Sequence, residues 1–130
     1  MQSKLREKMS KEAELLKWIE QASGRIRTTE ADALACLERG DVDKYNEGMR
    51  AKAEFLAGLS REAVPRLKGV DGKIAAHVKA ELAGFSASAS RSLDIGSVFF
   101  MSALLYPEDH RPGEPNNFDL FASELAGMIG

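Results

Sequence analysis

Apolar side chains recur at three- and four-residue steps along most of the chain, which is the spacing of one face of an α-helix. The longest such stretch begins at Asp71, a good N-cap residue, and contains no proline before Pro107. We therefore predict one helix over residues 71–106, about 50 Å long at 1.5 Å per residue. Its predicted inward face is formed by Ile74, Val78, Leu82, Phe85, Ala89, Leu93, Gly96, Phe100 and Ala103. Residues 98–105 are apolar on every side, so another element or a partner must cover them.

A second helical pattern extends over residues 3–39, where charges of both signs fill the outer face. Its predicted inward residues are Leu5, Met9, Leu16, Ile19, Ala22, Ile26, Ala33 and Leu37. Glu7 and Lys11 have the spacing and order of a favourable i,i+4 ion pair. Gly24 and the Thr28–Thr29 pair lower the stability of the helix at this point. Either threonine can be the N-cap of a second helix that begins there. The sequence leaves open whether this helix is continuous or kinked near residues 24–29.

Gly40 and Asp41 give the clearest signal of a chain reversal in the sequence. Glycine suits the left-handed position that ends a helix, and aspartate suits the N-cap of the next helix. So short a connection predicts an antiparallel hairpin with a second helix over residues 42–68. Pro65 predicts a kink or an early end, and Ser60 is a possible cap for a restart. The inward face is predicted from Tyr45, Met49, Ala53, Leu56, Ala63 and Leu67, flanked by Phe55 and Leu59.

The character of the chain changes after Tyr106. Residues 107–117, called the strap below, contain three prolines and show neither a helical nor a strand period. Asn117 is expected to cap a short helix over residues 118–129, with Phe118, Phe121, Leu125 and Met128 on one face. The sequence thus predicts an all-α fold, an elongated antiparallel helical bundle or coiled coil of three long helices plus a short C-terminal helix.

Length and composition limit the possible classes of protein. A chain of 130 residues provides one domain. A net charge of -2 argues against nucleic acid as the main partner. The single cysteine, Cys36, excludes an internal disulfide and a CxxC motif, which favours a reducing compartment. The charged N-terminal segment is not a secretory signal, and no apolar run reaches the roughly 20 residues of a membrane helix. We expect a cytoplasmic protein that does not enter membranes.

No arrangement of residues in the sequence predicts catalysis. His77 and Glu81 lie one helical turn apart and Asp109 precedes His110, but two ligands do not make a metal site. We interpret these histidines as solvated or as part of a polar turn, and Cys36 as a half-buried packing residue. We therefore predict neither an enzyme nor a cofactor, and a metal-binding bundle built on these four residues is the third of three hypotheses.

Two sets of residues are candidates for binding another protein. The first is apolar and lies in the last turns and the tail: Phe99, Met101, Leu104, Leu105, Phe118, Phe121 and Leu125. The tail helix can simply cover the end of the long helix, or it can act as a displaceable lid over a groove. The second is a ridge of small residues: Ala76, Ala80, Gly84, Ser88, Ser92 and Gly96. This ridge can let another helix approach closely, within the bundle or from a second subunit, or it can be a surface that packs against nothing. The leading hypothesis is a chaperone or adaptor for another protein's amphipathic helix, and the alternative is a homodimer packed through the ridge.

The segments Leu37–Asn46 and Arg50–Leu56 carry a resemblance to a known family. Their Gly-Asp turn, followed by a helix with a Lys/Glu-plus-Leu run, is similar to the flagellar export chaperones of the FlgN/FliT type. The resemblance covers residues 5–67. It implies a small cytoplasmic chaperone that keeps a secreted hook or filament-cap subunit competent for export. The strap and residues 96–106 match no feature of that family, and no binding residue is carried over from it.

Overall fold

The structure is a computed structural model that describes the backbone of residues 2–130 and the side chains of residues 11–130. All regular secondary structure in this part of the chain is helical, which confirms the all-α class. The elements are α1 (Gln2–Glu38), α2 (Val42–Ala63), the 3₁₀ turn η1 (Val64–Leu67), α3 (Gly72–Ile95), α4 (Val98–Ala103) and α5 (Asn117–Ile129). None of these helices is both long and apolar enough to cross a bilayer.

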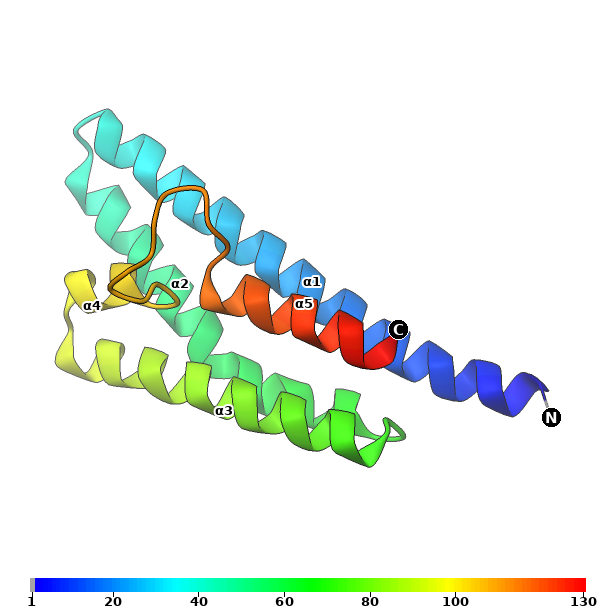
Figure 1. Cartoon of the computed structure of the whole chain (residues 1–130). Helices are drawn as coiled ribbons and strands as arrows, with labels where there is room; N and C mark the ends of the chain where they lie inside the picture. The colour runs from blue at the N-terminus through cyan, green and yellow to red at the C-terminus, as the bar shows by residue number, and fades with distance from the viewer. Residues whose placement is uncertain (1) are drawn as a thin grey trace.

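Four helices close a ring around the core (Figure 1). α1 packs on α2, α2 on α3, α3 on α5, and α5 returns to α1, while α4 packs on α2 and α3. Fully buried side chains from all four members of the ring meet inside it: Leu15, Ile19, Ile26, Leu56, Leu59, Val78, Leu82, Phe118 and Leu125. A smaller cluster of Ala33, Met49, Ala53 and Met101 fixes α4 near the α1–α2 hairpin.

The predicted hairpin turn is confirmed. Gly40 has a φ of +83°, and the Asp41 side chain accepts a hydrogen bond from the Lys44 N–H at 3.1 Å. α1 is continuous through Gly24, so the helix does not break and restart at residues 24–29, and Figure 1 shows no sharp change of direction in α1. The predicted roles of Leu5, Met9 and Glu7 concern side chains outside the described residues. Leu37 is exposed rather than inward, and Leu15, which the pattern did not assign to the core, is buried.

α2 ends early, as Pro65 predicted, because the α-helix stops at Ala63 and continues as the 3₁₀ turn η1. Ser60 is not a cap, since it lies inside α2. Its backbone N–H donates to the hydroxyl of Ser86 at 3.1 Å, and that hydroxyl donates to the Leu56 carbonyl at 2.8 Å. A side chain inserted into the hydrogen-bond ladder bends a helix. Figure 1 shows α2 changing direction partway along its length.

The prediction of one helix over residues 71–106 is wrong at Gly96. Asp71 caps α3 as predicted, but Gly96 takes a φ of +72° and its N–H donates to the carbonyls of Ser92 and Leu93. Ser97 then caps the separate helix α4 by accepting from the Phe100 N–H. This glycine–serine pair ends one helix and begins another, in the same way as Gly40 and Asp41. The predicted inward face therefore stops at Leu93, and Gly96, Phe100 and Ala103 are exposed.

The last helix begins one residue earlier than predicted. Its N-cap is Asn116 rather than Asn117, because the Asn116 side chain accepts from the Asp119 N–H at 2.8 Å. The Asp119 carboxylate accepts from the Asn116 N–H in return and completes a capping box. Phe118, Phe121 and Leu125 are buried as one face, whereas Met128 is exposed near the helix end.

A glycine inside α3 and the glycine that ends α3 are predicted to respond to alanine with opposite signs. Gly84→Ala should raise the free energy of unfolding by about 0.5–1 kcal/mol, because a Cβ there meets no atom within 4 Å and alanine favours helix. Gly96→Ala should lower it by about 1 kcal/mol, because alanine must adopt the left-handed conformation. Urea unfolding of both variants checks this pair. Equal effects at the two positions would contradict the Gly96 cap.

Candidate functional site

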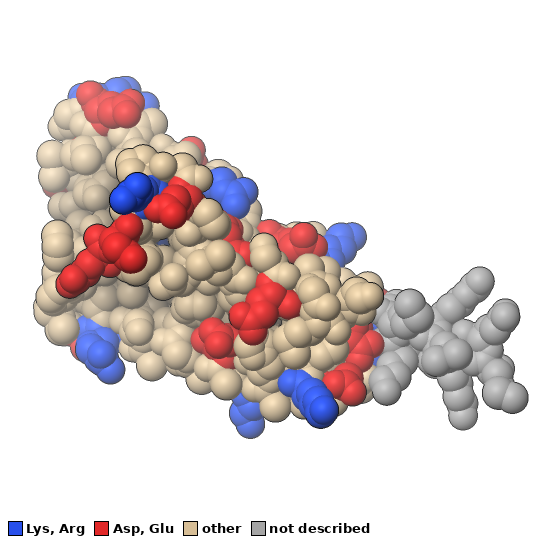
Figure 2. All heavy atoms as spheres, viewed as in Figure 1, with Lys and Arg blue, Asp and Glu red and all other residues tan. Residues whose placement is uncertain are grey.

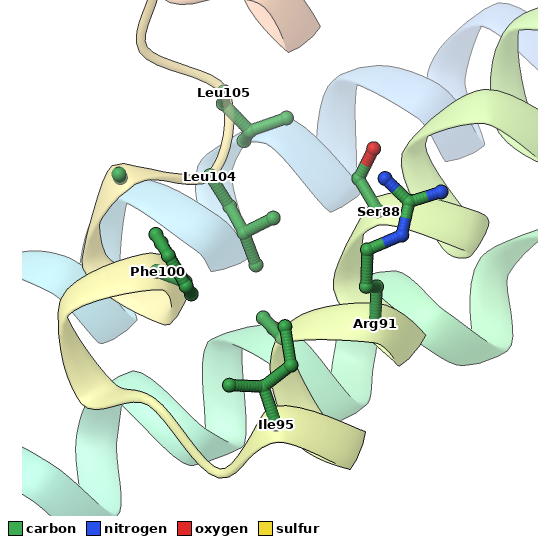
Figure 3. Close-up of a pocket in the computed structure, with 8 residues that line it drawn as sticks. Ser88, Arg91, Ile95, Phe100, Leu104 and Leu105 are labelled. Atoms are coloured by element: carbon green, nitrogen blue, oxygen red, sulfur yellow. The ribbon is translucent and has the colours of Figure 1, made fainter.

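A groove runs along α3 beside α4 and the start of α5. It consists of two adjoining hollows of about 420 and 370 Å³, which share Ser88, Leu104 and Leu105. Figure 3 shows the larger hollow, where Ile95 and Leu104 point toward one another, with Phe100 to one side and Arg91 and Ser88 to the other. In Figure 2, acidic side chains gather over the strap, and a largely uncharged surface lies between it and α3.

The floor of the groove is the predicted ridge of small residues. Ala80, Gly84, Ser88 and Ser92 line the two hollows, and all of them except Ser92 are exposed. Ala76 and Gly96 continue the ridge at its two ends and are exposed as well. Ser92 is thus buried inside the bundle, whereas the other five members of the ridge are exposed. The use of these five residues by a partner stays a prediction.

The wall opposite α3 is made by α4 and the two leucines that follow it. Leu105 is the one non-glycine residue with positive φ among the described residues, at +76°. A leucine in this region is strained, and such strain persists where the surroundings fix the backbone. Here the Leu104 carbonyl accepts from the Lys52 ammonium at 3.0 Å, and the Leu105 carbonyl accepts from the Asn117 N–H at 2.9 Å.

A buried charged network behind the wall holds α4 in place. The Lys52 side chain is 0% exposed, and its Nζ lies 2.8 Å from the Glu30 carboxylate. The same ammonium donates to the carbonyls of Ser102 and Leu104, which lie at the end of α4 and have no partner within that helix. The Tyr106 hydroxyl donates to the second Glu30 oxygen at 2.7 Å, and the Tyr106 ring lies 5.0 Å from Lys52 Nζ. Residues of α1, α2 and α4 are thereby tied to Tyr106, the residue before the strap.

Burial shifts two pKa values in this network. Desolvation lowers the pKa of Lys52, and the hydrogen bond and charge of Glu30 oppose that shift. Desolvation, followed by the hydrogen bond to Glu30, raises the pKa of Tyr106 to about 12. Each charge of this network is engaged by a partner, and the Lys52 ammonium holds two backbone carbonyls at the end of α4.

The structure separates the seven predicted apolar anchors into two groups. Phe99 is 74% exposed and Leu104 is half-buried at the groove wall. The other five are buried: Met101, Leu105, Phe118, Phe121 and Leu125. Of these five, Leu105 lines both hollows of the groove, and the other four line neither. The tail helix α5 packs mainly on α1 and α3, and Leu105 joins the buried cluster that α5 forms with them. Asp119 of α5 is bonded to Ser23 and Arg27 of α1.

The residues considered for metal binding are dispersed. His77 Nε2 lies 2.9 Å from a Glu124 carboxylate oxygen, although not in hydrogen-bond geometry, and His110 Nε2 lies 2.9 Å from the Glu114 carbonyl oxygen. No group of three or more His, Cys, Asp or Glu side chains gathers in the part of the chain that the structure describes. Cys36 is half-buried, and Arg39 donates to its sulfur at 3.3 Å.

Comparisons of the chain with protein-family models, with curated proteins and with solved structures find no match. The resemblance to flagellar export chaperones therefore stays a prediction.

Replacing Lys52 by methionine is predicted to destabilise the fold strongly. Lys52→Met leaves the Glu30 carboxylate, which is 14% exposed, and two carbonyls without their cation. Losing one partner of a buried ion pair costs about 3–5 kcal/mol. Urea unfolding measures the loss, and the exposed Lys44→Met on the same helix should change stability by less than about 0.5 kcal/mol. Similar losses in the free energy of unfolding for the two variants would show that the buried Lys52 ammonium does not stabilise the fold.

The raised pKa of Tyr106 predicts a stability difference that depends on pH. Between about pH 10 and 12 the unfolded chain loses the Tyr106 proton while the native protein keeps it, so native stability falls with rising pH. Tyr106→Phe lacks this ionisation. The stability advantage of the wild-type chain over Tyr106→Phe should be constant below about pH 9 and shrink above about pH 10. Urea unfolding across this range measures it, and a growing advantage would contradict the assigned environment.

Proposed function

We propose that this chain is a non-enzymatic protein-binding helical bundle that accepts an amphipathic helix of another protein in the groove over α3. The observation that carries this proposal is the groove itself, whose floor of small residues lies beside large apolar side chains left in water. Ile95 is 58% exposed and Phe99 is 74% exposed, and Phe100 is exposed beside them. An apolar patch of this kind marks an interaction site.

The shape of the groove supports a helix as its occupant. Small residues at four-residue steps let a second helix approach closely, because interaxial distance depends on the side chains at the contact. A helix in such a groove presents apolar anchors at i, i+3, i+4 and i+7. Leu104 and Leu105 on one side, and Phe100 and Ile95 at one end, supply the surfaces on which those anchors would pack.

Two charged residues give the groove a direction. Glu81 lines the hollow nearer the start of α3, and Arg91 lines the hollow nearer its end. Ten residues separate them, which is about 15 Å along a helix. A partner helix with a basic residue near Glu81 and an acidic residue near Arg91 is favoured in one orientation. Such exposed charges fix orientation and the rate of association more than affinity.

A chaperone role is the specific form of this proposal. The predicted resemblance implies a cytoplasmic chaperone or adaptor whose client is a secreted flagellar-type subunit, and an open groove for a helix suits such a client. Client release does not require displacement of α5, because Phe118, Phe121 and Leu125 belong to the core.

A second copy of the chain is the alternative occupant, as in the homodimer hypothesis. Glu81 and Arg91 are equally distant in sequence from residue 86, near the centre of the ridge. Two α3 helices packed antiparallel around that point would place each Glu81 against Arg91 of the other copy. This self-complementary arrangement is the form that a two-fold symmetric interface takes.

Photo-crosslinking in the native cytoplasm tests the proposal. A benzophenone amino acid at Phe100, which lines the groove, should capture one protein through a segment with apolar residues at helical spacing, whereas the same probe at the exposed Leu120 on α5 should not. Gly84→Leu fills the groove without a steric clash at Cβ and should reduce capture at least tenfold. Gly127→Leu, an equally open glycine on α5, should leave it unchanged.

The captured protein decides between the alternatives. A secreted subunit supports the chaperone form, and a second copy of this chain supports the homodimer. Capture that is equal at Phe100 and Leu120, or that is unaffected by Gly84→Leu, would overturn the groove as a binding site.

A further inference from the structure

A separate cleft lies on the α1–α2 side of the ring, away from α3. It has a volume of about 520 Å³, within the range of small-molecule sites. Trp18, Gln21 and Arg25 line it from α1, and Phe55, Glu62 and Arg66 line it from α2 and η1. A second hollow of about 310 Å³ adjoins it, because the two share Pro65 and Arg66, and adds Lys11, Glu14 and Lys68.

Two arginines of this cleft are held by stacking across the helix pair. The Arg25 guanidinium, from α1, lies 4.4 Å from the centre of the Phe55 ring on α2. The Arg66 guanidinium, from η1, lies 4.7 Å from the Trp18 ring on α1. Stacking on a ring engages the face of a guanidinium and leaves its N–H edge available for hydrogen bonds. The two groups are thus oriented before any ligand arrives.

The charges around the cleft are not paired with one another. Lys11, Arg25, Arg66 and Lys68 give four positive charges, and Glu14 and Glu62 give two negative charges. None of these six forms an ion pair within 4 Å among the described side chains. Glu62 and Arg66 are four residues apart, but Arg66 stacks on Trp18 instead. A chain of net charge -2 therefore carries a local excess of two positive charges here.

We propose that this cleft binds a small ligand through a polyphosphate group. The N–H edges of Arg25 and Arg66 form bidentate hydrogen bonds to phosphate oxygens, a geometry that guanidinium matches. Lys11 and Lys68 add point charge at the adjoining hollow. A compact ligand with several negative charges fits a cleft of this size and its unpaired cations better than a peptide helix, whose single carboxylates are spread over several turns.

The only tryptophan of the chain, Trp18, lies in the cleft and reports binding directly. Sodium tripolyphosphate, titrated at constant ionic strength, should change Trp18 fluorescence saturably, and calorimetry should give the same affinity. Arg25→Ala and Arg66→Ala should each weaken binding about tenfold or more, the loss expected for a charge-assisted hydrogen-bond pair. The affinity of Arg66→Lys for tripolyphosphate should fall between those of the wild type and Arg66→Ala, because lysine keeps the charge but cannot form the bidentate hydrogen bonds of a guanidinium. Arg50→Ala, an exposed arginine of α2 outside the cleft, is the matched control and should change affinity less than twofold.

Each remaining outcome supports or overturns the proposal. ATP that binds more tightly than tripolyphosphate identifies a nucleotide as the source of the phosphate group, and equal affinities identify the phosphate group alone. Absence of saturable binding, or an equal loss in Arg50→Ala, overturns the site. Citrate or an oligoglutamate peptide binding as tightly as tripolyphosphate overturns the assignment to phosphate. Gly84→Leu should leave tripolyphosphate binding unchanged, so this test is independent of the groove over α3.

Discussion

Burial of the Lys52 ammonium is the constraint on which the arrangement of this bundle depends. A charge removed from water must be fully engaged by partners, and here the partners come from distant parts of the chain: Glu30 on α1 and the carbonyls of Ser102 and Leu104. Satisfying this one group places the end of α4 against α1 and α2. The wall of the groove follows from that placement. The left-handed conformation of Leu105 is fixed on one side by the Leu104 carbonyl, which Lys52 holds, and on the other by its own carbonyl, which the Asn117 N–H holds.

The sequence predicted the parts of the fold that local chemistry decides. The helical class, the Gly40–Asp41 turn, the Asp71 cap and the early end of α2 before Pro65 each depend on a few adjacent residues. Gly96 and Ser97 carried the same kind of local signal, but periodicity in the surrounding apolar run obscured it. Lys52 was missed for a different reason. Its spacing marks it as an ordinary polar residue of α2, and its partners lie 22 and about 50 residues away in sequence.

The candidate site was predicted as two unrelated surfaces that the fold combines into one. The ridge of small residues and the apolar residues after Gly96 were each recognised, but only the break at Gly96 turns α4 back to form a wall beside the ridge. The α1–α2 cleft gave no signal in the sequence. Its stacked pairs join residues 30 or more positions apart, so neither arginine is distinguishable from a solvated surface charge until the helices are packed.

The ring is closed by the first and last helices of the chain, through Asp119 with Ser23 and Arg27. This closure has a consequence for synthesis of the protein. Once α3 has left the ribosome, α1, α2 and α3 can pair, but the side that α5 will cover stays apolar and open to water until α5 has also emerged and docked. Contacts between such distant segments also form late in folding, because a long loop must close first. The nascent chain therefore passes through a stage in which it exposes its own unfinished core, and proteins that protect nascent chains have most to bind at that stage.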